Sequence, residues 1–203
     1  KENNGFLPGQ PILVFGSTRP GDEELAAQCW RELRDEFPEL RLVIAPRHID
    51  RLRDAVAPFE EPILRRSQVR RLRKGDAERV FILDTLGELV DFYSIATVAV
   101  VGGSFYPGVN GHNPLEPAAL GIPTVFGPHM RNFADPARVL VEANGAIQVS
   151  APEELQEVLR NLLADVEARL RLAAQGRQVV ARNQGVVQRN VDLIDAVRSE
   201  EHT

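Results

Sequence analysis

Residues 102–123 read GGSFYPGVNGHNPLEPAALGIP and lie between two short apolar runs, VAVV at 98–101 and TVF at 124–126. Short apolar runs bounded by turn residues are typical of strands buried on both faces of a parallel sheet. A plain connection between two such strands needs only a few residues, whereas this one is long and rich in glycine, proline and asparagine. The stretch therefore predicts a loop that is elaborated to bind a ligand.

Similar apolar runs recur along the chain and alternate with helical patterns. Leu25, Cys29 and Leu33, for example, repeat at helical spacing after the first run. Strands that alternate with helices predict an α/β fold with a doubly wound parallel sheet, whose ligand lies beyond the carboxyl ends of the strands. About six strands are predicted, at 11–15, 41–46, 79–83, 98–102, 124–127 and 146–149. Helices are predicted at 16–37, 49–56, 87–96, 115–120, 132–145, 151–176 and 185–197. The helix at 151–176 is predicted to carry one apolar stripe, formed by Leu155, Leu159, Leu163, Val166 and Leu170.

The length of 203 residues allows one domain with a well-buried core or two small ones, and a single domain over residues 1–203 is predicted. Hydrophobic residues make up 43% of the chain and charged residues 26%, as in soluble proteins. The single cysteine, Cys29, excludes an intrachain disulfide and favours a reducing compartment. We expect neither a membrane span nor a signal peptide. The net charge of -5 gives no reason to expect binding to nucleic acid.

The HNPLEP segment has the spacing of a capping box. Asn113 suits the N-cap, Pro114 suits the first helical position, and Glu116 follows the cap by three residues. In one interpretation these residues only begin a helix. In the other, the helix start attracts an anion and Glu116 accepts hydrogen bonds from two ribose hydroxyls. Both interpretations remain open, and the DTLGEL segment, with Thr85 and Glu88, has the same spacing.

Other residues of the expected ligand edge follow earlier strands. Gly102 and Gly103 would let a ligand approach the backbone. Arg47 follows the second predicted strand, where it would bind phosphate, stack on a base, or form an exposed ion pair. Ser17 or Thr18 would cap the first helix, with acidic residues in its first turn complementing the helix dipole.

Several common types of site are disfavoured. His48, His112 and His129 show no short paired spacing and have no cysteine pair nearby, which argues against a metal site. Ser104 follows two glycines but lacks the G-x-S-x-G frame of a hydrolase nucleophile. The phosphate-binding Walker pattern and the dinucleotide pattern G-x-G-x-x-G are both absent.

A basic cluster lies between the second and third predicted strands, within ILRRSQVRRLRKGD. It forms either a solvated face or an edge that meets anionic lipid or a phosphorylated substrate. Its members are Arg65, Arg66, Arg70, Arg71, Arg73 and Lys74.

Seven segments, in order from Ser17 to Ala146, resemble the Kdo transferases, which attach 3-deoxy-D-manno-octulosonic acid (Kdo) to lipid A precursors in lipopolysaccharide biosynthesis. They are STRPGDEEL, LVIAPRH, RRS, DTLGEL, VVGGSF, GHNPLEPAALGIPTVFGPHMRNF and NGA. The resemblance implies the Rossmann-like, donor-binding C-terminal half of an inverting GT-B glycosyltransferase. Its donor would be CMP-Kdo, with no metal and no cofactor.

The resemblance also places the catalytic carboxylate, the membrane anchor and most acceptor contacts in an N-terminal half that is missing here. The parent enzyme would act at the cytoplasmic face of the inner membrane, on a lipid A precursor and against the anionic membrane surface, while this fragment would be soluble and inactive alone. CMP-Kdo or CMP and the missing half are therefore the expected partners. Two alternatives remain: a related domain for another nucleotide sugar, and a non-catalytic nucleotide-binding or partner-docking domain.

By the same resemblance, Glu116 would bind the ribose hydroxyls and Arg47 the cytidine or the phosphate. The implied nucleotide-binding residues are Pro46, Arg47, Thr85, Leu86, Gly87, Asn113 and Glu116. The residues implied on the phosphate and sugar side are Gly102, Gly103, Ser104, Gly111 and His112. No catalytic residue and no metal ligand is implied.

The chain departs from the family pattern in the spacer FYPGVNGHN, where Asn110 replaces a glycine and one residue is added. Asparagine tolerates a positive φ better than most residues, so we expect the turn to be retained. At the C-terminus, the helix at 185–198 has two interpretations. It either packs on its own sheet or crosses to the missing half.

Overall fold

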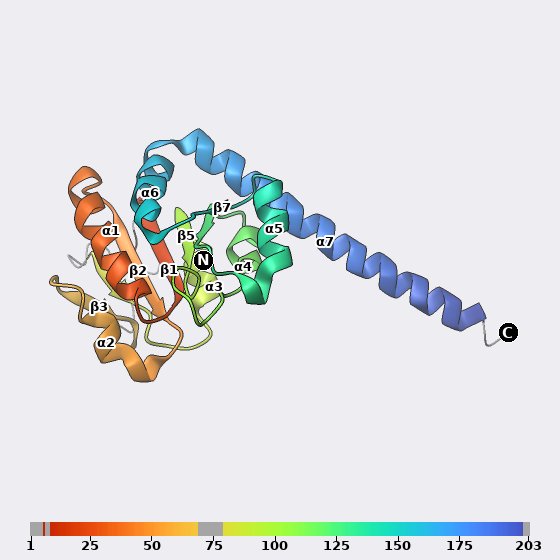
Figure 1. Ribbon diagram of the computed structural model, residues 1–203, viewed down its shortest axis with the longest axis horizontal. Helices are drawn as coiled ribbons and strands as arrows, with labels where there is room; N and C mark the ends of the chain where they lie inside the picture. Colours follow the sequence, from red (N-terminus) through yellow and green to blue (C-terminus); the bar gives the residue numbers. More distant parts are fainter. Residues whose placement is uncertain (1–5, 7–8, 69–78, 201–203) are drawn as a thin grey trace.

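A parallel sheet in the order β3-β4-β2-β1-β5-β6-β7, with helices on both faces, is the centre of the computed structural model (Figure 1). The structure describes residue 6, residues 9–68 and residues 79–200, and for residues 184–200 it describes only the path of the helix. The strands are β1 (Ile12–Thr18), β2 (Arg41–Pro46), β3 (Ile63–Arg65), β4 (Val80–Ile82), β5 (Val98–Val101), β6 (Thr124–Phe126) and β7 (Ile147–Gln148). The α-helices are α1 (Asp22–Glu36), α2 (Leu52–Val56), α3 (Leu89–Tyr93), α4 (Leu115–Ala119), α5 (Ala134–Glu142), α6 (Leu155–Ala164) and α7 (Val166–Glu200). The short 3-10 helices are η1 (Ile49–Arg51), η2 (Arg66–Gln68), η3 (Arg131–Phe133) and η4 (Pro152–Glu154).

The alternation of side chains along each strand fills two separate cores. Leu13 and Phe15 of β1 face a cluster that includes Leu25 of α1 and Leu159 of α6. Val14 of β1 faces the opposite side, where it packs with residues of α3. A third cluster joins the ends of β5 and β6 to α4, α5 and α7. The sheet is thus covered on both faces, which confirms the predicted doubly wound fold.

The described residues form seven strands, one more than predicted. The additional strand, β3, pairs with β4 at the edge of the sheet, and its three residues are all half-buried. Sequence analysis missed it because three residues at the start of an arginine-rich segment carry too little apolar pattern to indicate a strand. Arg65 ends this strand and Arg66 begins η2. The predicted basic residues from 70 to 74 lie outside the described residues.

Helix α1 begins later than predicted, and neither Ser17 nor Thr18 caps it. Thr18 is the last residue of β1 and still pairs with Pro46 of β2. Ser17 lies at a register shift in β1, between Gly16 and Thr18. The residue before the helix is Gly21, with a φ of +95°. Its backbone N–H donates a 2.9 Å hydrogen bond to Oε2 of Glu24. The strand therefore uses the two residues that had been predicted as caps.

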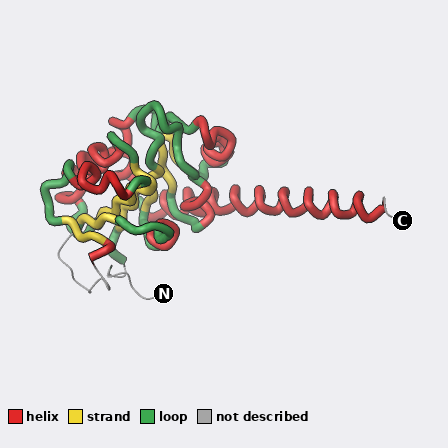
Figure 2. The backbone as a smooth tube through the Cα atoms, turned by 90° about the horizontal axis from the view of Figure 1, so that it is seen from below, coloured by secondary structure: helices red, strands yellow, loops and turns green. Residues whose placement is uncertain are grey.

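The predicted helix at 151–176 is divided, and the predicted last helix is part of a longer one. Asp165 separates α6 from α7 and accepts a 2.9 Å hydrogen bond from the N–H of Ala168, which begins the new helix. Leu170, predicted to lie on one apolar stripe with α6, is consequently 65% exposed. Figures 1 and 2 show that α7 first lies beside the body and then extends away from it.

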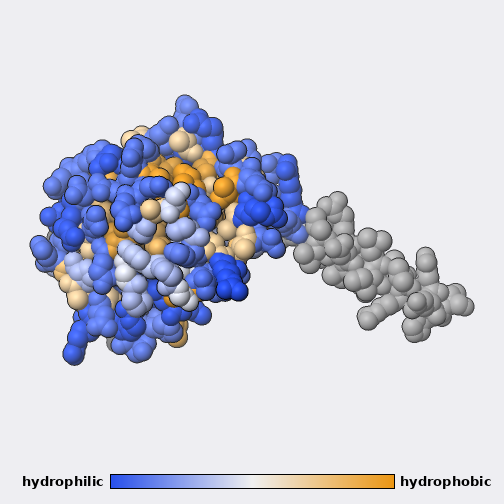
Figure 3. All heavy atoms as spheres, viewed as in Figure 1, coloured by the Kyte–Doolittle hydropathy of each residue, from blue (hydrophilic) through white to orange (hydrophobic). Residues whose placement is uncertain are grey.

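The surface of the body is largely hydrophilic in the view of Figure 3. Hydrophobic residues gather in the region of α6 and β7 in this view. In the described part of the chain, no helix is both long and apolar enough to cross a membrane.

Candidate functional site

The loops after β1, β2, β4, β5 and β6 lie at one edge of the sheet because the strands are parallel. The strand order reverses at β1, which has β2 on one side and β5 on the other. Ligands of doubly wound folds bind at such a switch point. The sequence-predicted site residues lie at this edge: Pro46 ends β2, Thr85 follows β4, and Gly103 and Asn113 lie between β5 and α4.

The Gly102–Gly103 turn packs the end of β5 tightly against the loop after β1. A Cβ on Gly102 would lie 2.8 Å from the carbonyl oxygen of Ser17 and 2.8 Å from Cα of Thr18. Gly103 has a φ of +67°, which disfavours residues with a side chain. The packing of the protein itself therefore requires these two glycines.

Asp22 holds these two loops together, a role that sequence analysis missed. Its side chain is 1% exposed, and Oδ2 accepts hydrogen bonds from the backbone N–H groups of Gly103 at 2.6 Å and of Arg19 at 2.8 Å. Burial raises the pKa of Asp22 to about 6, although both hydrogen bonds oppose the increase. An acidic residue in the first turn of a helix is common, so no local pattern indicates a bond to Gly103 across 81 residues.

Ser104 is fully buried, and its hydroxyl is used inside the protein. The hydroxyl donates a 2.6 Å hydrogen bond to the carbonyl of Val101 and accepts a 2.8 Å bond from the N–H of Gly127. A hydroxyl has one proton to donate. The side chain of Ser104 therefore joins β5 to the loop after β6 and does not face the open edge.

Four basic side chains from three loops gather beside this turn. Nε of Arg19 donates a hydrogen bond to Nε2 of His112 at 3.4 Å. Burial lowers the pKa of His112 to about 4. Neighbouring positive charges act in the same direction, in the order Arg19, Arg47 and His48. His112 is therefore neutral at physiological pH, while Arg47 remains exposed and positively charged.

The loop after β4 is held by the first part of the basic segment. Glu88 accepts hydrogen bonds from Nε of Arg66 at 3.0 Å and from Nη2 at 2.8 Å, and the hydroxyl of Thr85 donates to the same carboxylate. Burial alone would raise the pKa of Glu88, but these bonds and the charge of Arg66 lower it below its usual value. Ser67 adds hydrogen bonds of 2.8 Å and 2.6 Å to Asp84.

The loop after β4 contains three of the predicted binding residues, Thr85, Leu86 and Gly87. Thr85 does not cap a helix, because α3 begins only at Leu89. The hydroxyl of Thr85 instead donates to the side chain of Glu88. Leu86 at the tip is 80% exposed. A Cβ on Gly87 would meet no heavy atom within 4 Å. The tip of this loop is therefore open, whereas its base is fixed by the Arg66–Glu88 ion pair and by hydrogen bonds.

The HNPLEP segment forms the start of α4, but not the predicted capping box. Oδ1 of Asn113 accepts a 3.1 Å hydrogen bond from the N–H of Leu115, so Asn113 does stabilise the helix start. The Glu116 carboxylate does not return to the Asn113 backbone. Its Oε1 accepts a 3.3 Å bond from the Asn113 side-chain amide, and within the described residues Oε2 makes no hydrogen bond. Glu116 is exposed, so its carboxylate is available to a ligand.

The long spacer before His112 keeps its turn, as expected. Asn110 has a φ of +65° and Gly111 a φ of +85°. The N–H of Gly111 donates a 2.8 Å hydrogen bond to the carbonyl of Gly103, and the carbonyl of Asn110 accepts one of 3.0 Å from the N–H of Asn132. The loop is therefore fixed at both ends despite its asparagine.

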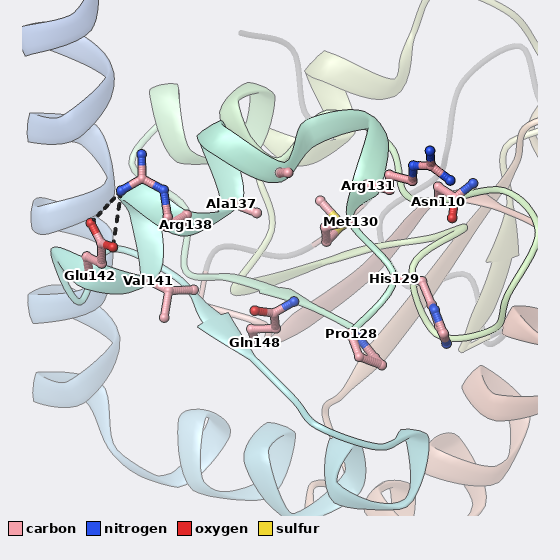
Figure 4. A pocket seen from close by; sticks show the side chains of 11 residues that line it. Asn110, Pro128, His129, Met130, Arg131, Ala137, Arg138, Val141, Glu142 and Gln148 are labelled. Carbon is pink, nitrogen blue, oxygen red and sulfur yellow. Dashed lines mark hydrogen bonds and ion pairs between the residues drawn. The ribbon is translucent and has the colours of Figure 1, made fainter.

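A cavity of about 460 Å³ lies at the ends of β6 and β7, beside α5 (Figure 4). Met130, Ala137 and Gln148 lie between its two ends. At one end Arg138 turns toward Glu142, 3.0 Å away. The lining residues are Asn110, Pro128, His129, Met130, Arg131, Ala134, Ala137, Arg138, Val141, Glu142 and Gln148. None of them was among the predicted binding residues, and within the described ranges no three His, Cys, Asp or Glu side chains are grouped to hold a metal ion.

No protein-family model matches the chain. Among curated proteins it is similar to the 3-deoxy-D-manno-octulosonic acid transferase of Haemophilus influenzae, with 35% identity over 192 residues. The match covers 91% of this chain and 44% of that protein. The chain thus spans less than half the length of this relative.

Two solved structures are similar in fold. The C-terminal CMP-Kdo binding domain of WaaA from Acinetobacter baumannii is 27% identical, and the match covers 87% of this chain and 92% of that domain with a TM-score of 0.79. Sucrose-phosphate synthase from Thermosynechococcus elongatus is 17% identical with a TM-score of 0.62, over 95% of this chain and 47% of that protein, which shows the fold alone. These likenesses confirm the predicted fold class, the Rossmann-like C-terminal half of a GT-B glycosyltransferase.

Proposed function

Because this chain belongs to the family of 3-deoxy-D-manno-octulosonic acid transferases, we propose that it is the part of a Kdo transferase that binds the donor, CMP-Kdo. One observation carries the proposal. Segments that are far apart in the sequence and match the family meet at one edge of the sheet: RRS pairs with DTLGE through Arg66 and Glu88, and STRPGD with VVGGSF through Asp22 and Gly103.

The nucleotide lies on the side of β2 and β4 in this proposal. The open backbone of Leu86 and Gly87 contacts the cytidine, together with Thr85 and Pro46, and Arg47 provides positive charge for the phosphate. The exposed carboxylate of Glu116, which Asn113 orients through its amide, accepts hydrogen bonds from the ribose hydroxyls. Such bonds to a charged group are among the stronger ones in binding sites.

The phosphate and the sugar lie on the side of β5, against Gly102, Gly103, Gly111 and His112. Ser104 supports this surface from behind, since its hydroxyl bonds to Val101 and Gly127. Without a resident metal ion, positive side chains and oriented N–H groups stabilise the leaving phosphate.

The reaction of the parent enzyme is an inverting displacement at the anomeric carbon of Kdo. An acceptor hydroxyl oxygen of a lipid A precursor forms a bond to that carbon. The bond to the phosphate oxygen breaks, and CMP leaves with the electron pair. The hydroxyl proton passes to a base in the N-terminal half, so no residue of this chain is proposed as catalytic. The parent enzyme works at the cytoplasmic face of the inner membrane and against its anionic surface. Within the parent enzyme, α7 of this chain crosses toward the N-terminal half.

Calorimetric titration of the chain with CMP, UMP and AMP, with and without EDTA, tests the proposal. CMP-selective binding that EDTA does not change is the expected result. Preference for UMP would favour a domain for another nucleotide sugar. Absence of binding to all three would contradict donor binding by this chain and favour a partner-docking role.

A further inference from the structure

Arg19 lies at the switch point and makes no salt bridge in the part of the chain that the structure describes, although its charge opposes the increase that burial causes in the pKa of the nearby Asp22. Its position is nevertheless well defined. The backbone N–H donates to Oδ2 of Asp22 at 2.8 Å, and its carbonyl accepts from the N–H of Asp22 at 2.9 Å. Its side chain is held by the bond from Nε to Nε2 of His112. A half-buried arginine that is fixed at three points and makes no salt bridge is suited to an anionic ligand.

His112 also determines which atoms of Arg19 remain available. Because His112 is neutral, with its pKa lowered to about 4, its Nε2 acts as a hydrogen-bond acceptor. The Nε–H of Arg19 is used in this bond, and among the described residues neither Nη group has a hydrogen-bond partner. The two Nη groups of an arginine form a planar fork that matches the two oxygens of a carboxylate.

The acids nearest to Arg19 form their hydrogen bonds with groups of the protein other than its guanidinium. Asp22 bonds to two backbone N–H groups, and Glu23, 1% exposed, accepts a 2.8 Å hydrogen bond from the hydroxyl of Thr18. Arg47 and His48 are exposed and close enough for their charges to act on His112. Within the described residues neither Arg19 nor Arg47 makes a salt bridge, so both guanidinium groups can meet an anionic ligand.

A Kdo donor carries two anionic groups, a phosphate and the carboxylate of its octulosonic acid. Arg47 lies at the end of β2, on the proposed nucleotide and phosphate side. Arg19 lies instead beside His112 and Gly103, on the proposed sugar side. We infer that Arg19, held by His112, binds the carboxylate of the donor sugar and so distinguishes an acidic sugar from a neutral one. This inference rests on the proposed donor-binding function.

The test compares CMP with freshly prepared CMP-Kdo, by calorimetry on the same chain at neutral pH. Arg19→Gln should weaken CMP-Kdo binding by about tenfold or more, as expected for lost hydrogen bonds to a charged group. It should leave CMP binding unchanged. Arg19→Lys, which keeps the charge without the fork, should lie between Arg19→Gln and the unchanged chain. Arg31→Gln, at an exposed site on α1, is the matched control and should change neither affinity.

The outcomes separate this inference from the function beneath it. If Arg19→Gln weakens CMP and CMP-Kdo equally, Arg19 contacts the phosphate, and the inference is wrong while donor binding stands. If it changes neither affinity, Arg19 does not contact the donor, and the inference is again wrong. If the unchanged chain binds neither ligand, the proposed function fails and the inference fails with it. A melting temperature for each variant shows that the compared chains are folded.

Discussion

The two sides of the ligand edge use their charges in opposite ways. On the β4 side, acidic side chains pair with neighbouring polar side chains, as Glu88 does with Arg66 at 2.8 Å and Asp84 with Ser67 at 2.6 Å. On the β1–β5 side, the buried acid Asp22 bonds to backbone N–H groups instead. Within the described ranges Arg19 makes no salt bridge.

This difference indicates two ways of preparing a binding surface. Pairing on the β4 side stabilises the base of a loop whose tip, at Leu86, is 80% exposed and offers backbone and apolar groups. On the β1–β5 side, the carboxylate of Asp22 fixes the loop geometry through backbone N–H groups and makes no salt bridge with Arg19. In the proposed function, the first side contacts the nucleotide and the second contacts the anionic groups attached to it.

Glycine substitutions should show the largest difference between the two sides. Gly102→Ala introduces a Cβ 2.8 Å from backbone atoms of Ser17 and Thr18, so overpacking should lower the free energy of unfolding by about 3 kcal/mol. Gly87→Ala meets no atom within 4 Å and carries only the cost of its φ of +84°, about 1 kcal/mol. Urea denaturation measures both. Equal losses would show that the β5 turn is not the crowded one.

The pH dependence of stability should have opposite signs on the two sides, and Asp22 makes the larger contribution. Its pKa is about 6 in the folded protein against a usual value of 3.8. The folded state therefore holds the proton more tightly, and stability falls as the pH rises through this interval. Each unit of difference between the folded and the usual pKa corresponds to about 1.4 kcal/mol. Above pH 6 the loss in free energy of unfolding therefore reaches about 3 kcal/mol.

Asp22→Asn tests this assignment, because asparagine is neutral and keeps an oxygen for both N–H groups. The variant should be more stable than the unchanged chain at pH 7.5, by up to about 3 kcal/mol, and equally stable near pH 4. Denaturant titrations at several pH values measure the difference. The contrary outcome is a variant that is less stable than the unchanged chain at pH 7.5 but not at pH 4. It would show that Asp22 stabilises the fold as an anion.

Glu116→Ala should weaken CMP binding by about 2 kcal/mol, because a carboxylate that accepts ribose hydroxyls is lost. The same substitution should weaken CMP-Kdo binding by the same amount, because both ligands carry the same ribose. This equal effect distinguishes Glu116 from Arg19. Calorimetry checks the affinities, with Glu157→Ala, an exposed acid on α6, as the control. A lower melting temperature with unchanged affinity would leave Glu116 with a purely structural role.

Glu88→Gln should have the smallest effect, a loss of about 1 kcal/mol in unfolding free energy at neutral pH. The pKa of Glu88 is lowered, so its contribution is present above its usual value of 4.5 and is lost as the pH falls through the folded value. The difference between the variant and the unchanged chain should therefore shrink in acid, the reverse of Asp22. Thermal unfolding of both chains at pH 3.5 and pH 7 measures this difference in stability. An equal difference at the two pH values would contradict the assignment to the ionised Glu88.

Much of the fold could be predicted, because its strands are apolar runs of simple local pattern. The six predicted strands are present, and the loops at their ends form one edge, as their parallel direction requires. The missed strand β3 has only three half-buried residues and is recognisable only through its pairing with β4. Asp165, which divides the predicted C-terminal helix, acts through a side-chain bond to Ala168 that the apolar stripe did not indicate.

The sequence by itself determined the positions of most strands of a doubly wound sheet, the family, and the short segments that meet at the ligand edge, because each is a local pattern of residue types. Only the tertiary structure decided what those residues do there. Ser104 became a buried support, Glu116 became an exposed carboxylate, and Asp22 became the link to Gly103. Hydrogen bonds between residues 81 or 93 positions apart depend on how the strands pair, which no local spacing records.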